Sequence, residues 1–171
     1  LRIVCFSSLL LAGNQLRIPS GPLREKLSNL RKFDAVFING KNINRQFLKK
    51  IKIINPDICI FSGEYVSSNY NKFRKNNYLT FSGIGNPNSF KNILNKYRIK
   101  NKLNLIYPDH YNYSELEIKK IKDIAKLKKL KILTTEKDFY RIPTKLRKNI
   151  NFLKINLKIK KLKEFEKFIF K

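Results

Sequence analysis

The sequence predicts an α/β fold, and three observations lead to this prediction. Short runs rich in Ile, Val and Phe recur along the chain, as expected of strands that are buried on both faces. Charged segments whose apolar residues follow helical spacing separate these runs. Loops containing Gly, Pro or Asn stand where a strand pattern gives way to a helix pattern. We therefore expect buried strands that are linked by helices.

Strands and helices alternate in the expected order of elements. The strands are expected at residues 2–6, 35–39, 58–62, 78–82, 104–107, 131–134 and 151–155. The helices are expected at residues 23–31, 45–53, 89–97, 114–128 and 162–170. The clearest helix start is at Ser114, whose hydroxyl can cap free amide groups, and Glu115 and Glu117 then favour the positive end of the helix dipole.

A polar segment at residues 66–77 predicts a linker between two lobes. Residues 1–77 would form a first lobe with the linker, and residues 78–171 a smaller α/β lobe. A chain of 171 residues can close two small lobes only if part of the first lies elsewhere. Because the chain contains no Met and opens at Leu1 directly on an apolar strand, we expect its natural start to lie upstream.

The chain is strongly basic, with 38 Lys and Arg against 12 Asp and Glu and a net charge of +26. Such a charge favours nucleic acid or an anionic membrane surface as a partner. The alternative is biased composition, because Lys, Asn and Ile are abundant and the lysines are spread along the chain. Apolar runs such as residues 9–12 are far shorter than the roughly 20 residues that span a bilayer.

Both cysteines lie in apolar runs without a partner at metal-ligand spacing. Cys5 and Cys59 are therefore expected to be reduced core residues of a cytosolic protein, and no metal ligands are expected in this chain.

The first candidate site is the loop at residues 13–25, which follows the first strand. A plain strand-to-helix connection with a Pro start explains it structurally. In the functional interpretation, Arg17 in the loop and Arg24 near a helix start hold phosphate groups through forked hydrogen bonds. Spacing alone leaves both interpretations open.

The second candidate site is the Gly83-Ile84-Gly85-Asn86-Pro87 run, which lies between a strand and a helix. Glycines there permit a close backbone approach or a positive φ, and the helix start could receive an anion. The run lacks the Lys-Ser/Thr ending of a Walker phosphate loop, so a tight turn is the default interpretation.

Two further candidate sites follow strands of the second lobe, where open α/β sheets place their ligand crevice. His110, the only histidine, stands beside Asp109 in a loop, and a catalytic and a structural role remain equally open. In the Thr134-Thr135-Glu136-Lys137-Asp138 run, either threonine could cap a helix, and Glu136 and Lys137 could be solvated charges.

Together these four runs, in this order, resemble the tetraacyldisaccharide 4'-kinase family. Its members show a Gly-Asn loop leading to Gly-Pro-Leu-Arg-Glu, as at residues 21–25, followed by Gly-Ile-Gly/Ala-Asn-Pro, Pro-Asp-His and Thr-Thr-Glu-Lys-Asp. The resemblance extends from Gly13 to Asp138, and residues 35–40 are also similar. Two departures stand out: Gln15-Leu16 precede Arg17 where the family has an arginine earlier, and Ser7-Ser8 replace a frequent acidic residue.

The resemblance implies a kinase that transfers phosphate from ATP, with Mg²⁺, to the 4'-hydroxyl of a tetraacylated glucosamine disaccharide in lipid A biosynthesis. It implies a phosphate-loop NTPase-like core lobe, of which residues 1–77 would be the carboxyl-terminal part, and a peripheral location at the cytoplasmic face of the bacterial inner membrane. The anionic membrane surface and the lipid precursor would be partners. The Walker lysine, the main Mg²⁺ ligands and the catalytic acid belong to the family's amino-terminal half, so we expect an inactive fragment.

The resemblance also implies roles for particular residues. His110, with Asp109, would support the acidic residue that takes the proton from the sugar hydroxyl. Phosphate or substrate binding would involve Asn14 and Arg24. The family's arginine contact cannot be carried over to Arg17, which stays a phosphate-binding candidate from its place in the loop. The loops that line the cleft would contribute Gly83, Gly85, Asn86, Thr135, Glu136 and Lys137. The rival hypothesis is a basic nucleic-acid-binding module, but most aromatics lie at predicted core positions and no recognised binding signature is present, so we expect no nucleic-acid partner.

Overall fold

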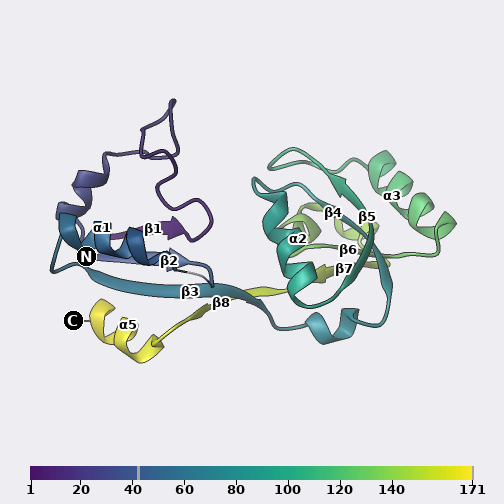
Figure 1. Cartoon of the computed structure of the whole chain (residues 1–171). Helices are drawn as coiled ribbons and strands as arrows, with labels where there is room; N and C mark the ends of the chain where they lie inside the picture. Colours follow the sequence, from purple (N-terminus) through teal and green to yellow (C-terminus); the bar gives the residue numbers. More distant parts are fainter. Residues whose placement is uncertain (42, 171) are drawn as a thin grey trace. The chain divides into compact units, whose positions relative to one another are not determined.

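The computed structural model of the chain describes residues 1–41 and 43–170, and it divides into two compact units (Figure 1). The first unit combines Leu1–Tyr65 with Leu157–Lys171, and the second comprises Val66–Asn156. The division at Val66 lies at the start of the expected linker. The carboxyl-terminal residues were expected in the second lobe, but the structure groups them with the first.

A four-stranded sheet in the order β1-β2-β3-β8 forms the centre of the first unit. Its strands are β1 (Ile3–Ser7), β2 (Ala35–Asn39), β3 (Cys59–Ser67) and β8 (Ile155–Ile159). The first three are parallel, with Ile3 opposite Ala35 and Ala35 opposite Cys59. β8 returns from the second unit and pairs beside β3, which is why residues 157–171 belong here.

Both faces of this sheet are covered, because successive residues of a strand point to opposite faces. On one face, Val36 and Ile38 share a core with Phe47 and Ile51 of α1 (Arg45–Ile54) and with Leu30 of the 3-10 helix η1 (Leu27–Lys32). On the other face, α5 (Leu162–Ile169) packs aromatic rings against β2 and β3. The ring of Phe165 lies 5.8 Å from that of Phe37 and 4.9 Å from that of Phe61.

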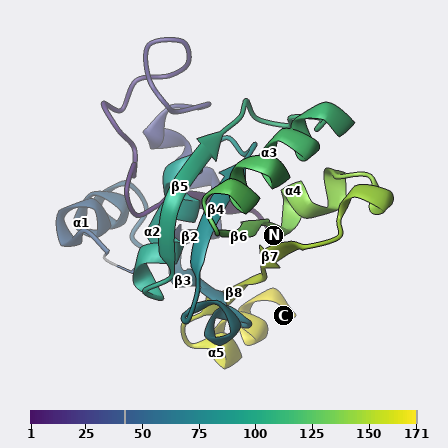
Figure 2. The same cartoon turned by 90° about the vertical axis from the view of Figure 1, so that its right-hand side faces the viewer.

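The second unit contains a fully parallel sheet in the order β5-β4-β6-β7 (Figure 2). Its strands are β4 (Asn77–Ser82), β5 (Lys100–Ile106), β6 (Lys131–Thr135) and β7 (Ile150–Leu153). Leu79 and Phe81 share a core with α3 (Glu115–Leu127) on one face. Tyr78 and Leu133 share a core with α2 (Pro87–Lys96) on the other. The unit also contains α4 (Glu136–Arg141) and the 3-10 helices η2 (Tyr70–Phe73) and η3 (Thr144–Leu146).

The structure confirms the α/β prediction and corrects several details. The helix expected at 23–31 begins only at Leu27, because the backbone of Leu23 is engaged in hydrogen bonds with Leu16 and Ile18. The strand expected at 151–155 is two strands, β7 and β8, separated by Lys154. Cys5 is exposed and Cys59 is half-buried, so Cys5 is not the core residue that was expected. Over residues 1–41 and 43–170, no helix has the length and apolarity needed to cross a membrane.

Candidate active site

Three loops of the second unit meet at one edge of its sheet. Gly83 follows β4, residues 108–110 follow β5, and α4 follows β6 directly. β4 lies between β5 and β6, and all three strands run in the same direction. Because the carboxyl ends of parallel strands share one edge, these loops lie at the edge where open α/β sheets generally bind ligands.

His110 lies at this edge of the sheet with its imidazole open to solvent. Its backbone N–H donates to the carbonyl oxygen of Gly83 at 3.2 Å and to Asp109 Oδ1 at 2.9 Å. The side chain is 80% exposed, and Nε2 lies 3.9 Å from Asp109 Oδ2. His110 thus lies beyond the end of β5 beside Gly83, whereas its expected position facing a cleft between the two lobes stays a prediction.

The two glycines of the Gly83 loop are explained by close packing. A Cβ on Gly83 would lie 2.9 Å from Tyr111 Cβ and 3.0 Å from the carbonyl oxygen of Pro108. A Cβ on Gly85 would lie 2.9 Å from Asp109 Oδ2. Real Cβ contacts are essentially never as short as 2.9 Å, so a Cβ on Gly83 would displace the segment of Tyr111. A Cβ on Gly85 would meet only the end of the exposed Asp109 side chain, which can move aside. Of the two explanations left open by the sequence, the structure supports close approach.

The Asp138 carboxylate hydrogen-bonds to all three segments of the site, although Asp138 was not among the predicted site residues. Its side chain is fully buried. Oδ1 accepts hydrogen bonds from the Gly83 N–H and the Tyr113 hydroxyl, both at 3.1 Å, and Oδ2 accepts from Thr135 Oγ1 at 2.6 Å. One carboxylate therefore ties together all three loops, since Tyr113 lies in the segment that leads from His110 to α3.

Arg141 connects this buried carboxylate to the exposed imidazole. Nη1 donates to the Gly83 carbonyl oxygen at 3.0 Å and lies 3.6 Å from Asp138 Oδ1. Nη2 lies 3.1 Å from Nδ1 of His110. The guanidinium thus spans the distance between a fully buried anion and the ring of His110.

Of the other residues predicted in these loops, Thr135 and Asn86 cap helices. Thr135 is buried and caps α4 by accepting the Asp138 N–H at 3.1 Å, as one of the two proposed capping threonines. Asn86 caps α2 by accepting the Ser89 N–H at 3.2 Å. Glu136 is half-buried and Lys137 is exposed. A Thr-x-x-Asp pattern directly after a strand is a cap signature, and it could have drawn attention to Asp138.

Burial raises the pKa of the Tyr113 hydroxyl, and the neighbouring Asp138 carboxylate raises this pKa further. In the unfolded chain tyrosine ionises near pH 10. Above about pH 10 the unfolded state therefore gives up this proton more readily than the folded state, and stability is lost as pH rises.

We expect Tyr113→Phe to flatten the alkaline fall in stability by up to about 1.4 kcal/mol per pH unit. The measurement is urea unfolding of wild type and variant between pH 9 and pH 11. Tyr140→Phe is the matched control, because that ring is exposed. If Tyr113→Phe and Tyr140→Phe give the same alkaline slope as wild type, the Tyr113 hydroxyl does not remain protonated in the folded chain.

The loop at residues 13–25 belongs to the first unit and is organised by Asn14. The Asn14 amide donates to the Ser20 carbonyl oxygen at 2.8 Å and accepts the Leu16 N–H at 3.1 Å. Gln15 accepts a hydrogen bond from Lys50 of α1, which ties the loop to the helix. Arg17 and Arg24 are both exposed, so their guanidinium groups are accessible to anions. The structure thus gives Asn14 a role in shaping the loop that presents Arg17.

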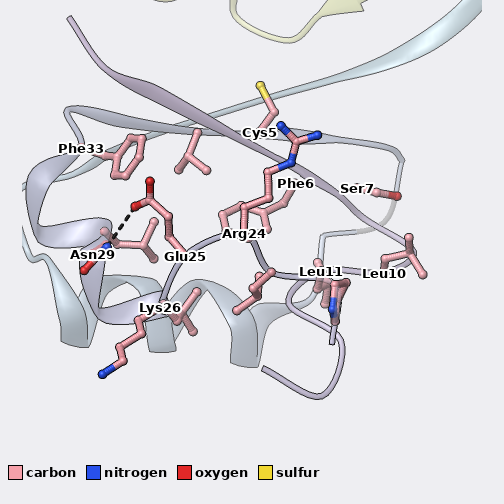
Figure 3. Close-up of a pocket in the computed structure, with 15 residues that line it drawn as sticks. Cys5, Phe6, Ser7, Leu10, Leu11, Arg24, Glu25, Lys26, Asn29 and Phe33 are labelled. Atoms are coloured by element: carbon pink, nitrogen blue, oxygen red, sulfur yellow. Dashed lines mark hydrogen bonds between the residues drawn. The ribbon is translucent and has the colours of Figure 1, made fainter. Parts of the chain in front are cut away.

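A pocket of about 400 Å³ lies between β1, this loop and η1 (Figure 3). Apolar side chains such as Phe6, Leu11 and Phe33 line it together with Arg24 and Glu25. The Glu25 carboxylate turns toward Asn29, whose amide donates to it at 2.9 Å. Arg24 is therefore the one predicted phosphate-binding residue that also lines this pocket.

Across residues 1–41 and 43–170, no three His, Cys, Asp or Glu side chains are grouped so that they could hold a metal ion. Glu25 is the carboxylate of the pocket beside β1, and it is engaged with Asn29.

Comparison with known proteins identifies similar chains of one kind. The family model described as tetraacyldisaccharide-1-P 4'-kinase matches residues 1–171. A tetraacyldisaccharide 4'-kinase of Pelagibacter ubique (strain HTCC1062) is 44% identical over 161 residues, which cover 93% of this chain and 51% of that protein. A tetraacyldisaccharide 4'-kinase of Rickettsia peacockii (strain Rustic) is 32% identical over 158 residues, which cover 92% of this chain and 48% of that protein. The chain thus spans about half the length of the curated relatives that it matches.

Proposed function

Because this chain belongs to the tetraacyldisaccharide-1-P 4'-kinase family, we propose that it forms part of an enzyme that phosphorylates the 4'-hydroxyl of a tetraacylated glucosamine disaccharide with ATP. One observation carries this proposal. Three of the four runs that resemble the family, which are far apart in the sequence, meet at a single sheet edge around the exposed His110 imidazole.

In the proposed reaction, His110 assists removal of the proton from the sugar hydroxyl. The acidic residue that takes the proton is proposed to come from the part of the family's length that this chain does not span. The carboxylate of that residue would take the proton, and His110 would hold the carboxylate in position by a hydrogen bond. Catalysis of phosphoryl transfer relies mainly on positioning and charge stabilisation, so a fixed imidazole fits this chemistry. Asp109 lies close enough to restrain the ring from its open side.

The exposed arginines are proposed to bind anionic groups. Arg17 and Arg24 offer planar guanidinium groups, which match phosphate oxygens in a forked geometry. The net charge of +26 would hold the enzyme near an anionic lipid surface, in keeping with a peripheral location at the cytoplasmic face of the inner membrane. ATP and Mg²⁺ would be bound chiefly by residues outside this chain.

The rival nucleic-acid-binding function receives less support. Binding of single strands uses exposed aromatic rings on which bases stack. Of the 13 Phe and 8 Tyr residues, only Tyr65, Tyr140 and Phe170 are exposed among the described residues. Tyr65 also interacts with another group of the chain, so few rings are available for bases to stack on. A salt-sensitive mobility shift of a random oligonucleotide at micromolar protein, together with absence of kinase activity in a longer chain, would favour the rival.

We expect the purified 171-residue chain to transfer no phosphate on its own, because the sequence has no Gly-x4-Gly-Lys-Ser/Thr loop to orient ATP. The measurement is transfer of labelled γ-phosphate to the lipid disaccharide in the presence of Mg²⁺. Joining the chain to a phosphate-loop half, taken from the Pelagibacter ubique relative, should produce activity. Transfer by the 171-residue chain alone would contradict the prediction, and an inactive but folded fusion would argue against the proposed function.

A further inference from the structure

The guanidinium group of Arg141 contacts the Gly83 and Asp138 oxygens through Nη1 and the His110 ring through Nη2. Its Nη1 is fixed by the Gly83 carbonyl oxygen at 3.0 Å and by the fully buried Asp138 carboxylate at 3.6 Å. Its Nη2 then lies 3.1 Å from Nδ1 of His110. The arginine side chain is only 23% exposed, whereas the imidazole is 80% exposed. An exposed imidazole is thus in contact with an arginine that is itself held by two partners.

The chemistry of this contact determines which ring nitrogen carries the proton. Arginine has only hydrogen-bond donors and stays charged in proteins, so it can donate to Nδ1 but cannot accept from it. A neutral imidazole donates from one nitrogen and accepts at the other, and the hydrogen bond made by one nitrogen sets the state of the other. Because Nδ1 accepts from Arg141, the proton of the neutral ring lies on Nε2.

We infer that Arg141 is a positioning residue that holds His110 as the Nε2–H tautomer, with Nε2, which lies 3.9 Å from Asp109 Oδ2, as a hydrogen-bond donor. Asp138 does not contact the imidazole itself but holds Arg141, Gly83 and Tyr113 around it. The inference rests on the proposed function for its catalytic meaning, because a donor at Nε2 can hold a carboxylate that takes a proton. Its structural content does not depend on that function. It also gives the buried Asp138 carboxylate a role near the exposed imidazole, because Asp138 holds the arginine that contacts His110.

Nitrogen NMR on protein labelled with ¹⁵N-histidine tests the tautomer directly, because the chain contains one histidine. In alkaline buffer, the wild-type 171-residue chain should show Nδ1 unprotonated and Nε2 protonated. Arg141→Met should shift the tautomer ratio toward Nδ1–H by about five-fold, the size expected for loss of one ordinary hydrogen bond. Arg74→Met is the matched control, since Arg74 is an exposed arginine of the same unit, and it should leave the ratio unchanged.

Comparable signals for the two tautomers in the wild-type chain would overturn the inference, even if Arg141→Met failed to fold. An unchanged ratio in a folded Arg141→Met chain would also overturn it. In an active fusion with a phosphate-loop half, Arg141→Met should lower kcat, and adding it to His110→Ala should cause no further loss. Further loss in the double variant would show that Arg141 acts independently of His110. An inactive wild-type fusion would count against the proposed function and leave the NMR result standing.

Discussion

Replacing His110 by Ala in an active form of the enzyme is expected to lower kcat by about 10²-fold while KM changes little. The reason is that the imidazole assists proton removal, which is felt mainly in the transition state. The ring is 80% exposed and packs against little, so its loss should not alter substrate binding or the fold. Steady-state kinetics with the lipid disaccharide as the varied substrate separates the two parameters.

A second substitution at this position controls for the backbone. His110 has a φ of 59°, a left-handed conformation that non-glycine residues seldom adopt and that Asn tolerates well. His110→Asn therefore removes the imidazole while keeping a residue suited to this turn. We expect both variants to lose kcat to a similar degree and to melt close to the wild-type temperature. If His110→Asn keeps normal kcat, or if both variants unfold at a markedly lower temperature while the folded fraction turns over normally, His110 is structural.

Buried strands and well-capped helices could be predicted from the sequence because their signals are local. The strand at 35–39 has the bounds of β2, since a run of apolar residues in a parallel sheet is buried on both faces. The helix start at Ser114 is confirmed as a capping box in which Ser114 and Glu117 each bond the other's backbone N–H. Gly83 and His110 could be placed after strand ends because the strands expected at 78–82 and 104–107 precede them.

Features that depend on contacts between distant segments could not be predicted. The return of β8 to the first sheet requires knowing that it pairs beside β3, a strand far from it in the sequence. The loss of the first turns of the helix expected at 23–31 follows from a bridge between Arg17 and Leu23. A charged run such as Glu136-Lys137-Asp138 looks like a solvated surface in the sequence. Burial of Asp138 becomes visible only once Gly83, Tyr113 and Thr135 surround it.

Removal of the Asp138 carboxylate is expected to have the largest effect on stability. Asp138→Ala should destabilise the second unit by about 3–5 kcal/mol, the cost typical of breaking a buried charged network by removing one partner. The substitution leaves the Gly83 N–H and the hydroxyls of Tyr113 and Thr135 without their acceptor in a buried site. It also removes the anion that holds Arg141. Urea unfolding followed by far-ultraviolet circular dichroism measures the loss.

Two comparison variants make the Asp138 result specific. Asp123→Ala removes an exposed aspartate of α3 in the same unit and should change stability by no more than about 0.5 kcal/mol. Tyr113→Phe added to Asp138→Ala removes one of the stranded donors, so the double variant should lose less than the sum of the single losses. Additive losses would mean that the hydroxyl and the carboxylate do not interact. A cost for Asp138→Ala as small as that for Asp123→Ala would mean that the three loops are held together without this carboxylate.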